Sequence, residues 1–267
     1  MGNHWEDIKT NDLLIADLGY FVPSCFKQIG ELGAYFISRY KADTNIYDAE
    51  TGAKLDLPEL LAHQSFVVKD VLLGKEAKLL VRIICHKLTD EQSAARRRKA
   101  NLLAKGHGYK SSQRNQKLLQ WSIFITNIAE NKVSAQHIWT IYRARWQIEL
   151  LFKLYKSHIT IEVIKGKNNR FRVLCELYAK LCALVVFHEI SSCVELKTDT
   201  ELSLTKALVE LKKRARELFL TLNQKFNHLQ DFLKKLLVDW SKFCLKDRYR
   251  KTRVSTLNML KSIAVNP

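Results

Sequence analysis

Along the first forty positions, apolar residues fall into short runs separated by turn residues, which predicts a strand, a helix and a second strand. Residues 12–17 form an apolar run that closes with Asp17, so we expect a buried strand with an acid at its carboxyl end. Pro23 suits the first position of a helix, and Gly33 ends that helix. Its apolar face is expected to consist of Phe26, Ile29 and Leu32. The next apolar run, 34–39, predicts another strand.

From residue 41 to residue 88 the pattern is typical of strands. Residues 89–120 predict a basic helix followed by a loop rich in Gly, Ser and Gln, and residues 121–126 predict a buried strand. A long helix is expected from Ser134, as its N-cap, to about His158. Leucines recur at helical spacing through the last hundred residues. This order predicts a mixed α/β fold with a β-rich insertion and a helical carboxyl-terminal tail.

Composition excludes several classes of protein. With 47% hydrophobic residues, 3 Pro and 9 Gly among 267, the chain is neither disordered nor of low complexity. The six Cys form no CxxC pair and no apolar leader is present, so a secreted disulfide scaffold is not expected. No apolar stretch approaches the length of a membrane span, and no Walker or Rossmann glycine pattern predicts a nucleotide cofactor. We therefore expect a soluble intracellular protein.

The net charge of +17 is concentrated in three segments, 89–120, 142–172 and 242–253, while the rest of the chain is neutral overall. Such concentration favours a polyanionic partner, most simply nucleic acid bound through its phosphates. The alternative is a set of solvated basic surfaces with no specific partner.

Residues 142–156 carry the most informative side chains. On one continuous helix, five polar side chains fall within an arc of roughly 80°, and Trp146 lies at its edge. The five are Tyr142, Arg145, Glu149, Lys153 and Lys156. The opposite, buried side is expected to hold Ile141, Ile148, Leu151, Phe152 and Tyr155. Arg145–Glu149 and Glu149–Lys153 could be ordinary exposed ion pairs, but the aromatic residues suit stacking on nucleotides.

A carboxylate at a strand end and another on a helix suggest a second interpretation. Two divalent ions bridged by carboxylates can activate a nucleophile and stabilise a leaving oxygen at a phosphodiester. Asp17 and Glu149 could jointly hold such ions while the basic residues grip DNA. Asp17 alone is weak support, because an Asp at a strand end often only caps a turn.

The spacing Tyr142-x2-Arg145-x3-Glu149-x6-Lys156 resembles the Y-R-E-K signature of bacterial insertion-sequence transposases of family four. Those enzymes belong to the DDE class and have a ribonuclease-H-like catalytic core. Asp17-Leu-Gly-Tyr-Phe is similar to that family's second acidic motif. Residues 36–41 (FISRYK) and 125–127 (ITN) are also similar to segments of that family.

The resemblance implies that Asp17 and Glu149 are catalytic acids that bind two Mg²⁺ ions. It implies that double-stranded DNA at the transposon ends is hydrolysed and then joined to a target by the freed 3′-hydroxyl. Two protomers would work together in a synaptic complex, so a homodimer is possible. The expected DNA contacts are Tyr142, Arg145, Trp146, Lys153, Lys156, Arg96, Arg97, Arg98 and Lys99.

The resemblance also implies a domain division. Residues 1–40 and 121–195 would belong to the ribonuclease-H-like core, 41–120 to the β-rich insertion and 196–267 to the helical region. The family needs three acids, and neither Asp7 nor Asp12 leaves room for the strands and helix that separate the first acid from the second. We therefore expect a carboxyl-terminal portion of a transposase that lacks the first acid and is inactive alone.

Two function classes compete. The first is a DDE transposase, cytoplasmic and associated with the nucleoid, with no membrane partner. The second is a non-catalytic DNA-binding or regulatory remnant that uses the same basic surfaces. An unrelated basic α/β protein would show no dependence of DNA binding on divalent ions.

Overall fold

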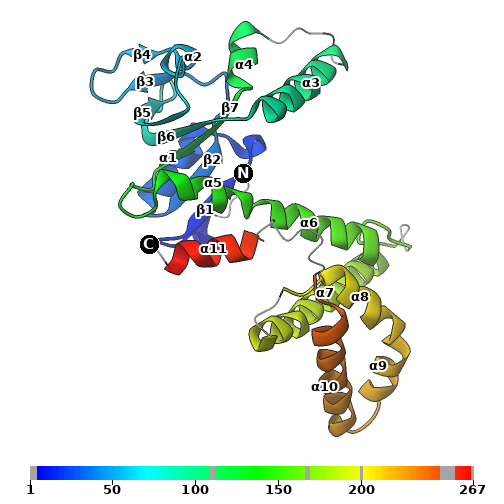
Figure 1. Cartoon of the computed structure of the whole chain (residues 1–267). Coiled ribbons are helices and arrows are strands. Elements are labelled where there is room, and N and C mark those ends of the chain that lie inside the picture. The colour runs from blue at the N-terminus through cyan, green and yellow to red at the C-terminus, as the bar shows by residue number, and fades with distance from the viewer. Residues whose placement is uncertain are drawn as a thin grey trace. The chain divides into compact units, whose positions relative to one another are not determined.

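The computed structural model describes residues 5–106, 108, 112–165, 169–198, 201–246 and 256–265 (Figure 1). The chain divides into two compact units. The first comprises Met1–Arg145 and Ser255–Pro267, and the second comprises Trp146–Val254.

A mixed sheet of seven described strands forms the centre of the first unit, in the order β1-β2-β7-β6-β5-β3-β4. The strands are β1 (Leu13–Ala16), β2 (Tyr35–Arg39), β3 (Ile46–Asp48), β4 (Lys54–Leu55), β5 (Phe66–Leu73), β6 (Leu79–Lys87) and β7 (Trp121–Thr126). The β1–β2 pair is parallel and the other neighbouring pairs are antiparallel. This arrangement confirms the mixed α/β class.

Helices cover both faces of the sheet. Successive side chains of the central strands point to opposite sides, so each face carries apolar residues on which a helix packs. Phe36 of β2 packs in one core cluster with Phe26 and Ile29 of α1 (Pro23–Glu31). The next residue, Ile37, packs in a second cluster with Ile138 of α5 (Ala135–Arg143). All six residues of β7 are buried, as expected for a strand with both faces covered.

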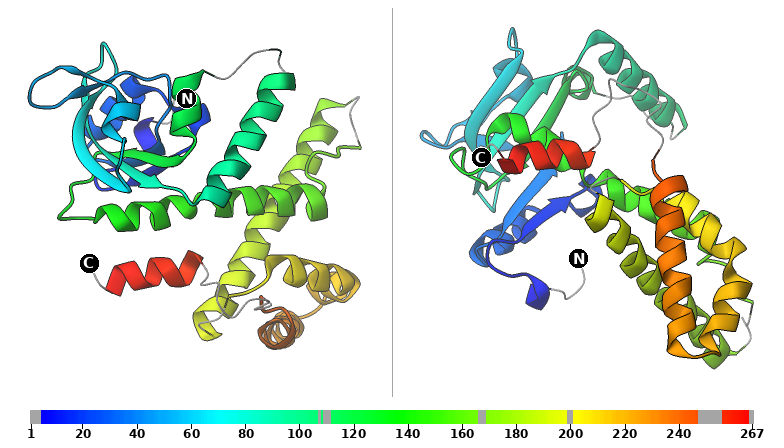
Figure 2. Two further views of the ribbon diagram at one scale, coloured as in Figure 1. Left: turned by 45° about the horizontal axis from the view of Figure 1, so that its top comes forward. Right: turned by 60° about the horizontal axis from the view of Figure 1, so that its bottom comes forward.

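The remaining helical segments of the first unit are η1 (Trp5–Asp7), η2 (Leu18–Tyr20), α2 (Leu57–Leu60), α3 (Asp90–Gly106), α4 (Gln113–Leu118) and α11 (Thr256–Val265). Figure 2 shows α11 alongside α5, where Arg143 Nη1 lies 3.5 Å from the sulfur of Met259. The end of the chain thus packs on the same unit as its beginning.

The second unit is helical. It contains α6 (Trp146–Leu154), η3 (Tyr155–Ile159), α7 (Arg170–Thr198), α8 (Leu204–Lys213), α9 (Ala215–Leu222) and α10 (Phe226–Phe243). Phe187 of α7, Leu208 of α8 and Trp240 of α10 meet in its core. The described part of the last hundred residues is thus largely helical, as expected.

Three local expectations for the first unit were wrong. Leu13 is 40% exposed because β1 lies at the edge of the sheet, and Leu32 is 40% exposed because it follows the last turn of α1. Within the expected loop, Gln113–Leu118 form α4, since Ser112 caps it by accepting a hydrogen bond from the Asn115 amide at 3.2 Å. Residues 107 and 109–111 of that loop lie outside the described residues.

The expected long helix from Ser134 to His158 is interrupted. Helix α5 ends at Arg143, and a turn at Ala144 and Arg145 separates it from α6. In that turn the amides of Ala144 and Arg145 donate to carbonyls three residues earlier, at 2.9 and 3.1 Å. The expected buried side is also wrong in part, because Ile148 and Phe152 are 58% and 56% exposed.

None of the helices in the described ranges is both long and apolar enough to cross a membrane. The basic segment 242–253 lies mostly outside the described residues.

Candidate functional site

Asp17 follows β1 directly and begins the short helix η2. One carboxylate oxygen, Oδ1, accepts a hydrogen bond from the Leu18 amide at 2.8 Å. The side chain is 49% exposed, so the carboxylate is accessible to solvent and ligands. The parallel register pairs Ala16 with Ser38, which brings Arg39, the next residue of β2, to the same edge of the sheet as Asp17.

Tyr142 and Arg145 reach this edge from the end of α5. Tyr142 is 8% exposed, and its ring centre lies 5.0 Å from that of Phe124 on β7. The guanidinium of Arg145, in the turn after α5, lies 5.7 Å from the centre of the Tyr142 ring. Arg145 Nη1 lies 3.5 Å from Asp17 Oδ2. The expectation that Tyr142 is displayed on a polar helix face is therefore wrong, because its ring is a buried support for Arg145.

The charges around Tyr142 show which groups share this edge. Burial raises the pKa of the Tyr142 hydroxyl, the positive charges of Arg145 and Arg39 oppose that rise, and the negative charge of Asp17 adds to it. Two arginines and one aspartate thus act on a single buried hydroxyl. Positive charge exceeds negative charge here, which suits the binding of a phosphate.

Arg39 is a candidate that the sequence did not single out. It lines an open pocket of about 340 Å³ together with Lys41 and Arg96. Burial lowers the pKa of Arg96, and the nearby charge of Arg39 lowers it further. The sequence signal for Arg39 is its place in the segment 36–41, which is similar to a segment of the family named above.

The four consecutive basic residues 96–99 of α3 divide into two kinds. Arg96 is partly buried and donates from Nη1 to the Trp121 carbonyl at 2.8 Å and from Nη2 to Ser122 Oγ at 3.4 Å. Arg97, Arg98 and Lys99 are exposed. Arg96 therefore anchors α3 to the start of β7, whereas the other three side chains face solvent.

The second half of the Y-R-E-K spacing lies in the other unit, since the boundary falls between Arg145 and Trp146. Glu149 and Lys153 are one turn apart on α6, and Trp146 at its start is 55% exposed. Lys156, on η3, makes an ion pair with Glu162 at 2.6 Å. Asp17 and Glu149 thus belong to different units, and their expected pairing stays a prediction.

The fit of a metal ion depends on the number and type of donors. A half-exposed carboxylate such as Asp17 offers the hard oxygen ligand that Mg²⁺ prefers. Within the described ranges, no group of three or more His, Cys, Asp and Glu side chains could hold a metal ion. The donor chemistry therefore fits Mg²⁺, but the number of described donors does not make a site.

Comparison with known proteins identifies the relationship. The family described as "Transposase DDE domain" matches residues 3–186, which is more than half of the chain. The chain belongs to this DDE transposase family. The match contains Asp17 and the whole spacing from Tyr142 to Lys156.

Curated relatives of this DDE-family chain are insertion-sequence transposases. The transposase for element IS231B of Bacillus thuringiensis subsp. berliner is 29% identical over 200 residues, covering 68% of this chain and 42% of the relative. The transposase for element IS1151 of Clostridium perfringens is 29% identical over 287 residues, covering 96% and 59%. The chain thus spans about half the length of the curated relatives it matches. No solved structure matches it significantly.

Proposed function

We propose that this chain is part of a DNA transposase that acts on the double-stranded ends of an insertion sequence. The observation that carries the proposal is the contact between Asp17 and Arg145. The ring of Tyr142 supports Arg145, and the charge of Arg39 acts on the hydroxyl of the same tyrosine. An acid beside fixed guanidinium groups can lie against a phosphodiester whose charge those groups bind. The named activities of the relatives support the same reaction class.

In the proposed reaction, water attacks a phosphodiester at each end of the element and a 3′-hydroxyl is released. This hydroxyl attacks a phosphodiester of the target, so that a new P–O bond forms as the target's own 3′-oxygen leaves. Arg145 and Arg39 bind phosphate oxygens, and Tyr142 fixes the position of Arg145. Asp17 and Glu149 are the proposed catalytic acids and Mg²⁺ ligands, in a core that is ribonuclease-H-like. Since the described donors do not make a complete metal site, no step is assigned to the ions.

The DNA contacts are proposed to extend over both units. In the first unit, the exposed cations of α3 and Arg96 would lie along the duplex beyond the site. In the second unit, Trp146, Lys153 and Lys156 would contact nucleotides next to Glu149. The division into core, insertion and helical region, and a working homodimer, are part of the same proposal.

The first experiment measures the affinity of the chain for terminal DNA by fluorescence anisotropy over a series of salt concentrations. The slope of log K against log salt is about −0.9 per phosphate contact. Arg145→Gln and Arg39→Gln should each make the slope shallower by about one contact, whereas Lys234→Gln, an exposed cation of α10, serves as the matched control. Equal slopes for all four proteins would refute the proposed phosphate contacts.

The second experiment tests the acids. In a complete transposase that carries these residues, Asp17→Asn and Glu149→Gln should abolish Mg²⁺-dependent nicking and leave DNA binding intact. Nicking that survives either change would remove that residue from the catalytic set.

A second candidate, a non-catalytic DNA-binding role, is favoured by the ion pair between Asp17 and Arg145. In that role Asp17 only orients Arg145 towards phosphate. It predicts that Mg²⁺ changes neither the affinity for DNA nor its integrity.

A further inference from the structure

Helix α5 is tied to the sheet at the end opposite to Arg145. Arg82 of β6 is only 6% exposed, and its guanidinium makes an ion pair with Glu130 in the β7–α5 connection. Nη2 of Arg82 also donates to the Val133 carbonyl at 2.8 Å. One buried side chain therefore holds two points of the connection that leads into α5.

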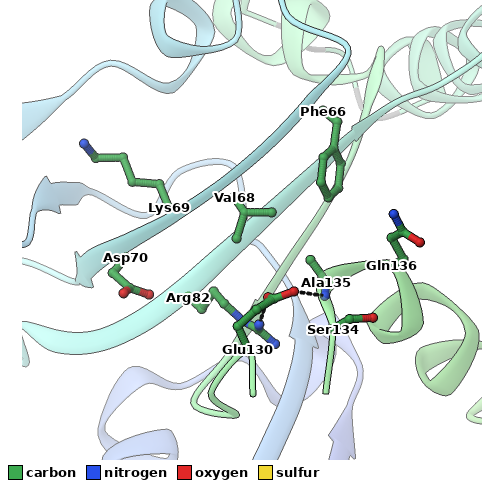
Figure 3. A pocket seen from close by; sticks show the side chains of 9 residues that line it. All are labelled: Phe66, Val68, Lys69, Asp70, Arg82, Glu130, Ser134, Ala135 and Gln136. Atoms are coloured by element: carbon green, nitrogen blue, oxygen red, sulfur yellow. Dashed lines mark hydrogen bonds and ion pairs between the residues drawn. The ribbon is translucent and has the colours of Figure 1, made fainter. Parts of the chain in front are cut away.

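Glu130 passes this restraint on to the helix. Its Oε1 accepts a hydrogen bond from the amide of Ala135, the first residue of α5, at 3.0 Å (Figure 3). Ser134 holds the N-cap position, but its side chain makes no capping hydrogen bond in the described contacts. The carboxylate of Glu130 therefore supplies the cap that the sequence assigned to Ser134, and it places negative charge at the positive end of the helix.

These groups line an open pocket of about 580 Å³ between α5 and the uncovered part of the sheet. Phe66 and Val68 of β5 are 40% and 39% exposed beside it. The side-chain bonds from Arg82 and Glu130 therefore add to the apolar packing of Ala135 and Ile138 in restraining the start of α5. Burial lowers the pKa of Arg82, and the charge of Glu130 opposes that shift.

Helix α5 is the rigid link between this anchor and the candidate site. It has nine residues, so about 13 Å separate its ends at 1.5 Å per residue. Tyr142 lies in its last turn, packed on Phe124, and the turn that follows carries Arg145. A tilt or slide of the start of α5 would therefore move the guanidinium that faces Asp17.

We propose that Arg82 and Glu130 are positioning residues that fix α5 so that Arg145 reaches Asp17 and the bound phosphate. The proposal rests on the proposed function, because it takes Arg145 as a phosphate contact. Neither residue touches DNA. Each acts through the start of α5.

The test compares Arg82→Met, which keeps an unbranched stem without the guanidinium, with wild type in the same anisotropy measurement. The salt slope should become shallower by about one contact, and affinity at low salt should fall at least fivefold. The double variant Arg82→Met/Arg145→Gln should bind no more weakly than Arg145→Gln alone, because both changes remove the same contact. Lys69→Met is the matched control, since Lys69 lines the same pocket but pairs with Asp48 at 2.8 Å.

A purely structural role gives a different result. Arg82→Met would then lower the melting temperature, yet below that temperature it would bind DNA with the wild-type salt slope. Alternatively, in the double variant the fold-loss of affinity from Arg82→Met would multiply the fold-loss from Arg145→Gln. Either result overturns the proposal. Since Arg82→Met leaves Glu130 without its cation, Arg82→Met/Glu130→Gln is the second variant. It keeps an acceptor for the Ala135 amide and should give the same slope as Arg82→Met.

Failure of the proposed function is separately visible. If wild type does not bind DNA, or if Arg145→Gln keeps the wild-type slope, then Arg145 is not a phosphate contact. The anchoring is then judged by hydrogen exchange of amides 138–143 in Arg82→Met, with β1, which does not pair with β6, as internal reference. Exchange at least tenfold faster in α5 supports the anchor, and unchanged exchange overturns it.

Discussion

Asn127 joins the end of β7 to β2 through its side chain, and its replacement by alanine tests how these two strands are held together. Its Oδ1 accepts a hydrogen bond from the Phe36 amide at 2.8 Å, and its Nδ2 donates to the Ala34 carbonyl at 2.9 Å. The last backbone pair of the ladder is Ile37 with Thr126. The amide group of Asn127 thus continues the ladder where the backbone of β7 turns away.

The cost of Asn127→Ala follows from these two bonds. Loss of the bond to the Ala34 carbonyl costs about 0.5–1.5 kcal/mol, and loss of the acceptor for the amide of Phe36, a fully buried residue, costs about 1–3 kcal/mol. Together these effects destabilise the first unit by about 2–4 kcal/mol. Asn127→Asp keeps the acceptor but places a charge beside the Ala34 carbonyl, so we expect a comparable loss.

Hydrogen exchange followed by mass spectrometry measures this cost, because peptides covering β2 and β7 report on the first unit alone. A loss of 2 kcal/mol corresponds to exchange about 30-fold faster in both strands. Asn223→Ala is the control, since Asn223 makes an exposed hydrogen bond to the Phe219 carbonyl at 3.0 Å in the other unit. A change below threefold in β2 and β7 would refute the view that Asn127 completes the ladder.

Four further predictions concern stability and charge. Gly30→Ala should stabilise the first unit by about 0.5–1 kcal/mol in thermal melting, because the added Cβ meets its nearest described atom at 3.7 Å. Gly33→Ala should destabilise it by about 1 kcal/mol, because φ there is +71°. Burial lowers the pKa of His188, so as pH falls the unfolded chain binds a proton at this histidine before the folded chain does. The stability of the second unit should therefore fall as pH drops below about 6.5. Melting experiments at several pH values should show a weaker dependence for His188→Gln. Asp17→Asn should change stability by less than about 1 kcal/mol, because its 3.5 Å contact with Arg145 is half exposed, and a larger loss in melting experiments would make Asp17 a structural residue.

The strands of the central sheet could be predicted from local pattern, because burial of both faces requires uninterrupted apolar runs. The run 121–126 became β7, and 34–39 became β2 with one residue fewer. The short strands β3 and β4 could not be located, since β3 is held by its pairing with β5. Their own residues carry little periodicity over so short a length.

The candidate site could be predicted where a residue carries its own signal, or where it belongs to the Y-R-E-K spacing as Tyr142 and Arg145 do. Asp17 ends an apolar run, so it was visible in the sequence. Arg39 was not, because its place beside Asp17 depends on the parallel register that pairs Ala16 with Ser38. Glu130 was missed for a similar reason, since its cap on α5 depends on Arg82 from a distant strand.

The interruption at Ala144 and Arg145 changes what the spacing of the signature means. Projection onto one helix places Tyr142 and Arg145 on a shared solvent face, but α5 ends between them and the two residues have different surroundings. Tyr142 is buried against Phe124, whereas Arg145 leaves the helix in a tight turn and faces Asp17. The helix ends within this two-residue gap, so the ring lies inside the core while the guanidinium emerges from the turn that follows. A periodicity argument registers the spacing but cannot detect this stop, since neither proline nor glycine marks it.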